Sequence, residues 1–378
     1  IADIGASASP YSEQVGNDVS TSMDGGRVGV FAICRKLVTR NGSEWFLPVL
    51  KFTFVITHFA ESKTHLELFE RTMRSLFAQS DPDWSAVVID DASPLESSYA
   101  LLESWRDRAP DWIFLERSLV SGGAGAARNV AIRRAASLCA DVVLLNDNDD
   151  LSHPERLART RAAFLRNREL DFLYTGLRPI DAGDMDIPDA QTRLDILEIM
   201  EELRGDPPEG ADIFAAMAAE TGCLIIPSTA AVKTSLALKL RFPGGFASED
   251  NHTWMRMAAA GANFAYLRDT PIGYRIWRQE VSDLGVNGRS QAFLWEKARN
   301  DIDGFECGVL IALEQGRLAP GEVAPLTRRF LDRVASCVGR QGEAGLAARL
   351  RSDAFLEAEL ARLPRAPAVP AMQLRRTG

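Results

Sequence analysis

The feature that most constrains the fold is an alternation of buried-strand and helix patterns between residues 51 and 150. The strand-like runs are "KFTFVITHF", "WSAVVIDDAS", "WIFLE" and "DVVLLND". Helix-like segments separate them, beginning at Ser62, at Tyr99 and after the glycine-rich stretch 121–126. This alternation predicts an α/β fold with a mostly parallel sheet and helices on both of its faces.

Polar residues follow several of these strands at the point where each ends. Thr57 ends the first, Asp90 and Asp91 end the second, and Asp147 and Asp149 end the fourth. Ligands of such sheets bind beyond the carboxyl ends of the strands. We therefore expect these side chains to converge on one crevice.

Asp147 and Asp149 are separated by one residue, so their carboxylates can approach a common point. Carboxylate oxygens favour Mg²⁺ or Mn²⁺, which commonly bridge to substrate phosphates. An EF-hand is excluded, because Ser152 and Ala158 occupy the positions that need Gly and Glu. A solvated turn that caps the next helix remains the alternative.

Two further segments could carry chemistry. The stretch "SGGAGAARN", residues 121–129, places glycines before a helix, where backbone N–H groups and Arg128 can approach an anion. It is neither a dinucleotide-binding nor a Walker pattern, and a purely structural helix entry is equally compatible. Asp250 opens a later predicted helix, where it could be a general base or only a partner of the helix dipole.

The rest of the chain predicts several further segments. Asn41-Gly42 indicates a β-hairpin within 27–50, after a flexible leader over 1–26. Residues 182–220 read as a helical excursion, "TGCLIIPS" and "ANFAYL" as strands, and 289–363 as a helical region before a flexible tail over 364–378. Residues 51–150 and 151–288 form the two halves of the predicted α/β domain.

Composition narrows the function. A net charge of -9 argues against a nucleic-acid partner. Five scattered cysteines without a CxxC pair indicate reduced thiols and a cytoplasmic protein. No apolar run reaches the roughly 18 residues of a transmembrane helix, and the first residues lack the pattern of a signal peptide.

The order of these segments resembles the family 2 glycosyltransferases of GT-A fold over roughly residues 51 to 285. The matching pieces are "FTFVITHF", "VVIDDASP", "GGAGAARNVAI", "LLNDNDDLSHPERL", "TGCLII" and "ASEDNHTWMRMAAAG". The resemblance implies a GT-A fold and sugar transfer from a nucleotide-diphosphate donor, UDP first, to a glycan, lipid-linked or small-molecule acceptor.

The resemblance also implies roles for individual residues. The DxD element, Asp147 and Asp149, would hold Mn²⁺ or Mg²⁺ on the donor diphosphate. The general base would be Asp250, with Glu249 beside it, in a single displacement that inverts the anomeric carbon. The nucleotide would contact Thr57, His58, Phe59, Glu61, Asp91, Arg128, Asn129 and Asn148. The acceptor and diphosphate side would include Gly222, Cys223, Arg275, Trp277 and Arg278.

One departure from the family pattern concerns the metal. Trp277 stands where the family often has a histidine, so Arg275 or Arg278 could supply charge instead. Two other classes remain open: a non-catalytic nucleotide-sugar-binding module, and a sugar-phosphate nucleotidyltransferase. The sequence leaves the donor sugar, the acceptor and a homodimeric state open.

Overall fold

The computed structural model describes strand residues 13–16, 35–40 and 43–48 and residues 50–244, 247–276 and 291–363. Most of the expected leader and all of the expected tail over 364–378 lie outside the described residues. Strands β2 (Arg35–Arg40) and β3 (Ser43–Pro48) pair antiparallel, with Arg40 opposite Ser43, as the Asn41-Gly42 turn predicts. Strand β1 (Glu13–Gly16) joins them at β2, inside the segment expected to be a leader.

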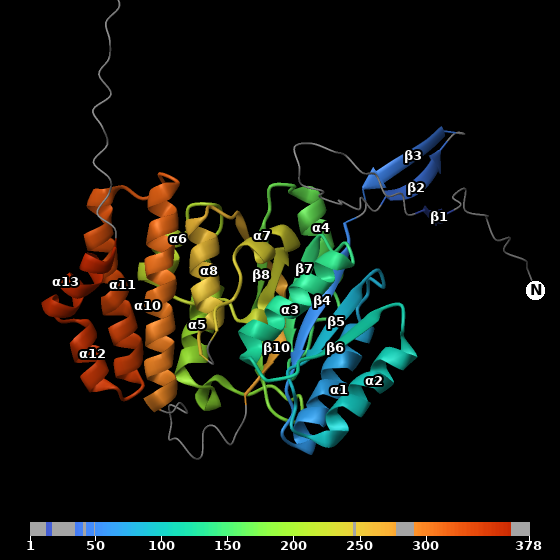
Figure 1. Ribbon diagram of the computed structural model, residues 1–378, viewed down its shortest axis with the longest axis horizontal. Coiled ribbons are helices and arrows are strands. Elements are labelled where there is room, and N and C mark those ends of the chain that lie inside the picture. Colours follow the sequence, from blue (N-terminus) through green and yellow to red (C-terminus); the bar gives the residue numbers. More distant parts are fainter. Residues whose placement is uncertain are drawn as a thin grey trace, which may run out of the picture.

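The main sheet of the described residues has seven strands in the order β10-β8-β9-β7-β4-β5-β6 (Figure 1). Neighbours pair in parallel, except that β9 runs antiparallel to both β7 and β8. The strands are β4 (Phe52–His58), β5 (Ser85–Asp90), β6 (Ile113–Arg117), β7 (Val142–Asp147), β8 (Phe172–Ile180), β9 (Ala230–Lys233) and β10 (Phe264–Arg275). The expected mostly parallel sheet is confirmed, and the carboxyl ends of β4, β5 and β7 share one edge.

Side chains alternate between the two faces of the sheet because successive residues of a strand point to opposite sides. In β4, Val55 belongs to one apolar core while Phe54 and Ile56 belong to the other. Helices α1 (Lys63–Phe77), α2 (Glu96–Arg108) and α4 (Arg156–Arg166) cover the face of Phe54. Helices α3 (Gly123–Ser137), α7 (Thr234–Lys239) and α8 (Glu249–Ala259) cover the face of Val55. The result is a three-layer α/β domain.

The predicted helical region at the C-terminal side consists of α10 (Gln291–Glu314), α11 (Pro320–Arg340), α12 (Ala344–Leu350) and α13 (Asp353–Arg362). These helices lie beside α8, on the side of the sheet away from α1 and α2 (Figure 1). Phe305 of α10 stacks on Phe330 of α11 with ring centroids 4.1 Å apart. Both rings belong to the same apolar core as Val55, so the C-terminal helices share the core of the sheet. No described helix is long and apolar enough to cross a membrane.

Two sequence predictions differ from the structure. "TGCLIIPS" is not a strand: a π-helical turn over Met217–Thr221 and a 3-10 turn over Pro227–Thr229 flank an unpaired stretch, and the strand comes after it, as β9. Leu224 and Ile225 are buried in that stretch, and an apolar run indicates burial without fixing strand pairing. Strand β8 is a second difference, because no strand is predicted over these residues. The expected helical excursion contains a 3-10 turn (Asp189–Gln191), α5 (Leu194–Arg204) and α6 (Phe214–Ala216).

His58, at the end of β4, is a buried histidine that ties three segments together. Its Nε2 lies 2.9 Å from the Ser98 hydroxyl of α2, and its Nδ1 lies 3.1 Å from the Asn148 amide. Its ring packs edge-on against Phe69 of α1 at 4.7 Å. Burial lowers the pKa of His58 from 6.5 to about 4, with the charge of Asp90 acting in the opposite direction.

This lowered pKa predicts a pH-dependent stability. The unfolded chain takes up a proton near pH 6.5 and the folded chain only near pH 4, so the contribution of His58 is present above pH 6.5 and lost as the pH falls toward 4. The loss should reach up to about 3 kcal/mol, measured by denaturant unfolding across this range. His58→Gln should flatten the slope, and His153→Gln should not. An unchanged slope in His58→Gln would contradict this assignment.

Candidate active site

A cavity of about 390 Å³ lies at the carboxyl ends of β4, β5 and β7. The predicted crevice at this edge of the sheet is therefore present. It brings together most of the residues expected at a nucleotide and its diphosphate. The predicted residues that line it are Thr57, His58, Phe59, Asp91, Arg128, Asp147, Asn148, Asp149 and Arg275. We call it the donor-side cavity.

A second cavity of about 540 Å³ adjoins the first, and Arg128, Asp147 and Tyr274 line both. Its wall includes four of the residues expected as base or on the acceptor and diphosphate side, Gly222, Cys223, Glu249 and Asp250. The wall also includes residues of α5, α10 and α11, so it extends beyond residues 151–288 into the C-terminal helices. We call it the acceptor-side cavity.

Gly222 shapes the wall between the acceptor-side cavity and α11. Its φ of +74° lies in the left-handed region, which favours glycine. A Cβ atom built at this position would lie 2.5 Å from Arg333 Nη1, so a side chain would also displace that arginine. Burial raises the pKa of the adjacent Cys223 thiol, with Asp250 adding to the effect, which makes the thiol a poor nucleophile here.

Arg128 of α3 lies at the junction of the two cavities and is almost fully buried. Its Nη2 donates to Asp147 Oδ1 at 2.7 Å, and its Nη1 donates to Glu249 Oε1 at 2.6 Å. Its guanidinium also lies over the ring of Phe242 at 5.4 Å. Burial alone would lower the pKa of Arg128, but Asp147 and Glu249 raise it above the ordinary value. The arginine is therefore a fixed positive charge between two acids.

The turn after β7 carries Asp147, Asp149 and Asp150, which we call the acid triplet. Asp150 is buried: its Oδ1 accepts from the backbone N–H of Arg275 at 2.9 Å, while its Oδ2 has no hydrogen-bond partner among the described residues. Burial, followed by the charges of Asp149 and Asp147, raises the pKa of Asp150 well above its ordinary value. The turn thus concentrates negative charge at the wall of the donor-side cavity.

Asp91 receives the backbone amides of the glycine-rich loop. Its carboxylate accepts from Gly122 N–H at 3.0 Å, from Gly123 N–H at 2.8 Å and from the Ser121 hydroxyl at 2.8 Å. The loop amides expected to face an anion therefore face this carboxylate. Asp90 points elsewhere, into a 3.0 Å ion pair with Arg117. Of the two aspartates, Asp91 is the one that lines the cavity.

Glu249 and Asp250 form the first turn of α8. Asp250 is half-buried, and its Oδ1 accepts from the N–H of Asn251 at 2.8 Å. Burial, and then the charge of Glu249, raise the pKa of Asp250 to about 7 against the opposing effect of Arg128. A carboxylate with this pKa can accept and release a proton near neutral pH, as a general base must.

Helix α10 holds this first turn in place, through residues that the sequence reading did not identify. Asp301 accepts from the Ser248 hydroxyl at 2.6 Å, from the Asn251 amide at 2.7 Å and from Lys297 Nζ at 2.6 Å. Ser248 itself has the left-handed φ of +61°. Lys297 and Asp301 lie outside the stretch that carries the family resemblance. Their i, i+4 spacing indicates an ion pair within one helix. It does not indicate that Asp301 contacts the start of α8.

Some predicted site residues lie elsewhere or have other partners. Asn129 lines neither cavity: its amide group exchanges hydrogen bonds of 2.9 and 3.0 Å with the backbone of Phe242. Glu61 is exposed and also outside the cavity walls. Arg275 lines the donor-side cavity, but its guanidinium is bonded to the Asp149 carbonyl at 2.7 Å and to Asp184 at 2.7 Å. Trp277 and Arg278 lie outside the described residues.

Comparisons with known proteins give one family match and several structural neighbours. No curated protein matches the chain. Among solved structures, S. aureus TarS 1–349 in complex with UDP-GlcNAc shares 18% identity over 82% of this chain and 91% of that chain, with a TM-score of 0.49. PcManGT, a mannosyltransferase from Pyrobaculum calidifontis with GDP-Man and Mn²⁺, shares 17% over 82% and 86%, with a TM-score of 0.46. At these values the likenesses carry no argument about what this chain binds.

Residues 53–213 match the family model described as Glycosyl transferase family 2. The matched segment contains Asp91, Arg128 and the acid triplet, and so most of the donor-side cavity. Glu249 and Asp250 lie beyond it in sequence, and Arg128 joins them to it through Glu249. The match identifies a family 2 glycosyltransferase domain over residues 53–213.

Proposed function

We propose that the chain transfers a sugar from a nucleotide-diphosphate donor, with UDP as the expected nucleotide, to an acceptor hydroxyl with inversion at the anomeric carbon. The observation that carries the proposal is the pair of adjoining cavities that meet at Arg128 and Asp147. One holds the acid triplet, and the other holds Asp250 with a pKa of about 7. A donor and an acceptor placed in them would meet at the shared wall.

The donor-side cavity has polar and aromatic groups suited to a nucleoside. The ring of Phe59 is 38% exposed, which leaves an apolar surface on which a base can pack. Asp91, held by the loop amides, offers carboxylate oxygens to ribose hydroxyls. Asn148 and Thr57 also line this cavity.

The acid triplet fits a divalent cation by the chemistry of its donor set. It offers only carboxylate oxygens, which Mn²⁺ and Mg²⁺ prefer, and it includes the unpartnered Asp150 Oδ2 in a surplus of negative charge. We assign the ion to Asp149 and Asp147, with Asp147 already bound to Arg128 through one oxygen. When bound, such an ion would offset the negative charge of the diphosphate leaving group.

The residues of this chain account for the remaining chemistry. Asp250 removes the proton of the acceptor hydroxyl while its oxygen forms the new bond to the anomeric carbon. The bond from that carbon to the diphosphate breaks in the same displacement, and the electron pair leaves with the nucleoside diphosphate. Arg128, buried between the two sides, keeps a positive charge beside the reacting centre. Burial at the junction strengthens each of these electrostatic interactions.

The nucleotide is tested by thermal stabilisation with UDP, dTDP, GDP and CDP, each with Mn²⁺, with Mg²⁺ and with chelator. Ligand that binds only the folded chain raises its stability by RT ln(1 + [L]/Kd). We expect the largest rise with UDP and metal, lost in Asp149→Ala and retained in Asp111→Ala, which removes an exposed acid before β6. An equal rise in thermal stability with chelator would show that the nucleotide binds without metal. No rise with any nucleotide would contradict the proposal.

The general base is tested with Asp250→Asn, which keeps the size of the side chain and removes its basicity. Turnover should fall by about 10²-fold or more, while UDP still stabilises the protein. Because Asp250 must be ionised to accept a proton, wild-type kcat should rise with pH through about 7 and be lost below it. Asp206→Asn, at an exposed acid after α5, serves as the control. A variant that retains full turnover would exclude Asp250 as the base.

Asp301 is a positioning residue, and Asp301→Asn tests it. The substitution leaves Lys297 without its carboxylate partner, and Lys297 lowers the pKa of Asp250. We therefore expect kcat to fall by about tenfold and the acid limb of its pH profile to move to lower pH, with UDP binding unchanged. Asp332→Asn, on the exposed side of α11, is the matched control. A loss of stability without movement of the pH profile would reduce Asp301 to a structural residue.

A further inference from the structure

Helices α8 and α10 approach each other closely at Gly304 of α10. A Cβ atom built on Gly304 would lie 2.6 Å from the Cα of His252, and one built on Gly308 would lie 2.6 Å from the ring of Phe214. The two glycines are four residues apart, so they lie on the same face of α10. Asp303 and Cys307, which precede them, have the same spacing and lie beside the same crossing.

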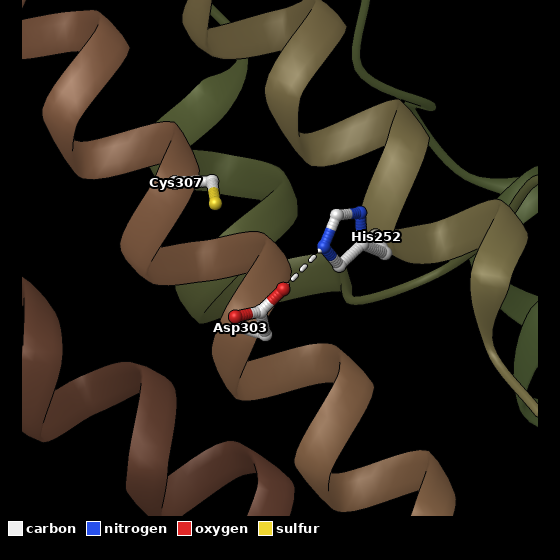
Figure 2. A group of neighbouring side chains, drawn as sticks. All are labelled: His252, Asp303 and Cys307. Atoms are coloured by element: carbon white, nitrogen blue, oxygen red, sulfur yellow. Dashed lines mark hydrogen bonds and ion pairs between the residues drawn. The ribbon is translucent and has the colours of Figure 1, made fainter. Parts of the chain in front are cut away.

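His252 completes a group of three ligating side chains at this crossing. Its Nε2 lies 2.8 Å from Asp303 Oδ2, and the ligand atoms of His252, Asp303 and Cys307 all lie within 4.8 Å of one another. Figure 2 shows the imidazole of α8 and the carboxylate and thiol of α10 directed toward a common space between the helices. Among the described residues, this is the one such group found, and the acid triplet is not part of it.

We propose that His252, Asp303 and Cys307 bind a zinc ion that cross-links α8 to α10. Nitrogen, sulfur and oxygen ligands are the set that Zn²⁺ takes in proteins, whereas Mg²⁺ and Mn²⁺ prefer oxygen alone. Tetrahedral Zn²⁺ with bonds of about 2.0–2.3 Å separates its ligand atoms by roughly 3.4–3.8 Å. The histidine–aspartate contact would open slightly to reach this spacing. The fourth position would go to water.

The surroundings allow an ion to enter and to stay. The Asp303 side chain is 63% exposed, while that of His252 is 5% exposed, so solvent reaches the site at Asp303. His252 Nδ1 is buried with no hydrogen-bond partner among the described residues, while Nε2 pairs with Asp303. Asp301 and Arg256 are the charged neighbours of the site. Glu306 also lies near Cys307, but burial and then Glu359 raise its pKa to about 8, so its carboxyl group is mostly protonated at neutral pH. The Arg256 guanidinium donates to the Arg241 carbonyl and to the Thr253 hydroxyl.

The protonation states set the pH dependence of binding. Burial, with Arg256 adding to it, lowers the pKa of His252 and keeps the ring neutral, as a metal ligand must be. Burial, with Asp303 adding to it, raises the pKa of the Cys307 thiol. Binding therefore releases the thiol proton to solvent as the Zn–S bond forms, and affinity should rise with pH. The site needs no oxidant or reductant.

The position of the site gives it a structural consequence. His252 follows Asp250 by two residues in the first turns of α8, and α10 already holds this region through Asp301. A zinc cross-link would add a second fixed point between the helix that carries the proposed base and the C-terminal helices. Bound zinc should therefore raise the thermal stability of the protein. This effect should depend neither on which nucleotide the protein binds nor on its catalytic activity.

The test uses the full chain, freed of metal with chelator and titrated with Co²⁺ as a spectroscopic substitute for Zn²⁺. Thiolate ligation gives an intense sulfur-to-cobalt charge-transfer absorption that oxygen ligands do not. We expect this band to saturate at one equivalent, to disappear on addition of Zn²⁺, and to be lost in Cys307→Ser. Cys139→Ser should keep it, as should Asp149→Ala, because the acid triplet has no sulfur.

Binding is measured independently by calorimetry with Zn²⁺ and by thermal unfolding. Cys307→Ser and His252→Gln should each weaken zinc binding by more than about tenfold and remove the zinc-dependent rise in melting temperature. Unfolding of the metal-free variants shows whether they remain folded, and Asp303→Asn provides a third variant at an exposed position. A wild-type protein without the charge-transfer band, or a band that persists in Cys307→Ser, would overturn the proposal.

Discussion

The site depends on one buried charge. Arg128 joins Asp147 at the end of β7 to Glu249 at the start of α8, with both ion pairs shorter than 2.8 Å. Burying charges costs free energy unless they are paired, and removing one partner leaves the others unpaired. Without Arg128, the acid triplet and the acids of α8 would face each other across one wall. The arginine therefore makes it possible for two acidic clusters to share a junction.

Helix α8 connects the main sheet to the C-terminal helices. Its buried Trp254 packs on Phe172 of the sheet and donates from Nε1 to the Ile225 carbonyl at 2.9 Å. Its first turn is held by Asp301 from the opposite side. The helix is thus packed between the sheet and α10, and the proposed base belongs to the turn that Asp301 contacts. The C-terminal helices contribute to the site as part of one core, although they lie outside the matched family segment.

Carboxylates are crowded on both sides of the junction, and their pKa values show it. Asp150 and Asp250 both have raised pKa values, in each case first through burial and then through neighbouring acids. Such crowding destabilises a fold unless a ligand or a proton relieves it, and perturbed carboxylates tend to occur at functional sites. In the proposed reaction, a metal ion on the diphosphate would reduce the repulsion between the carboxylates of the acid triplet. The proton taken from the acceptor would reduce the repulsion between Asp250 and Glu249.

Local patterns in the sequence predict strands and the polar residues that follow them. Continuous apolar runs, typical of strands that are buried on both faces, predicted β4, β5 and β7. The polar residues at their ends placed Thr57, Asp91 and the acid triplet at one edge, because parallel strands end on the same side. The partners of these groups, in contrast, depend on the tertiary structure. Asn129 turned to the backbone of Phe242, and Asp301 reached Ser248 from a helix about fifty residues later. An apolar run such as "TGCLIIPS" shows burial but not pairing, and contacts between distant segments leave no local periodicity to read.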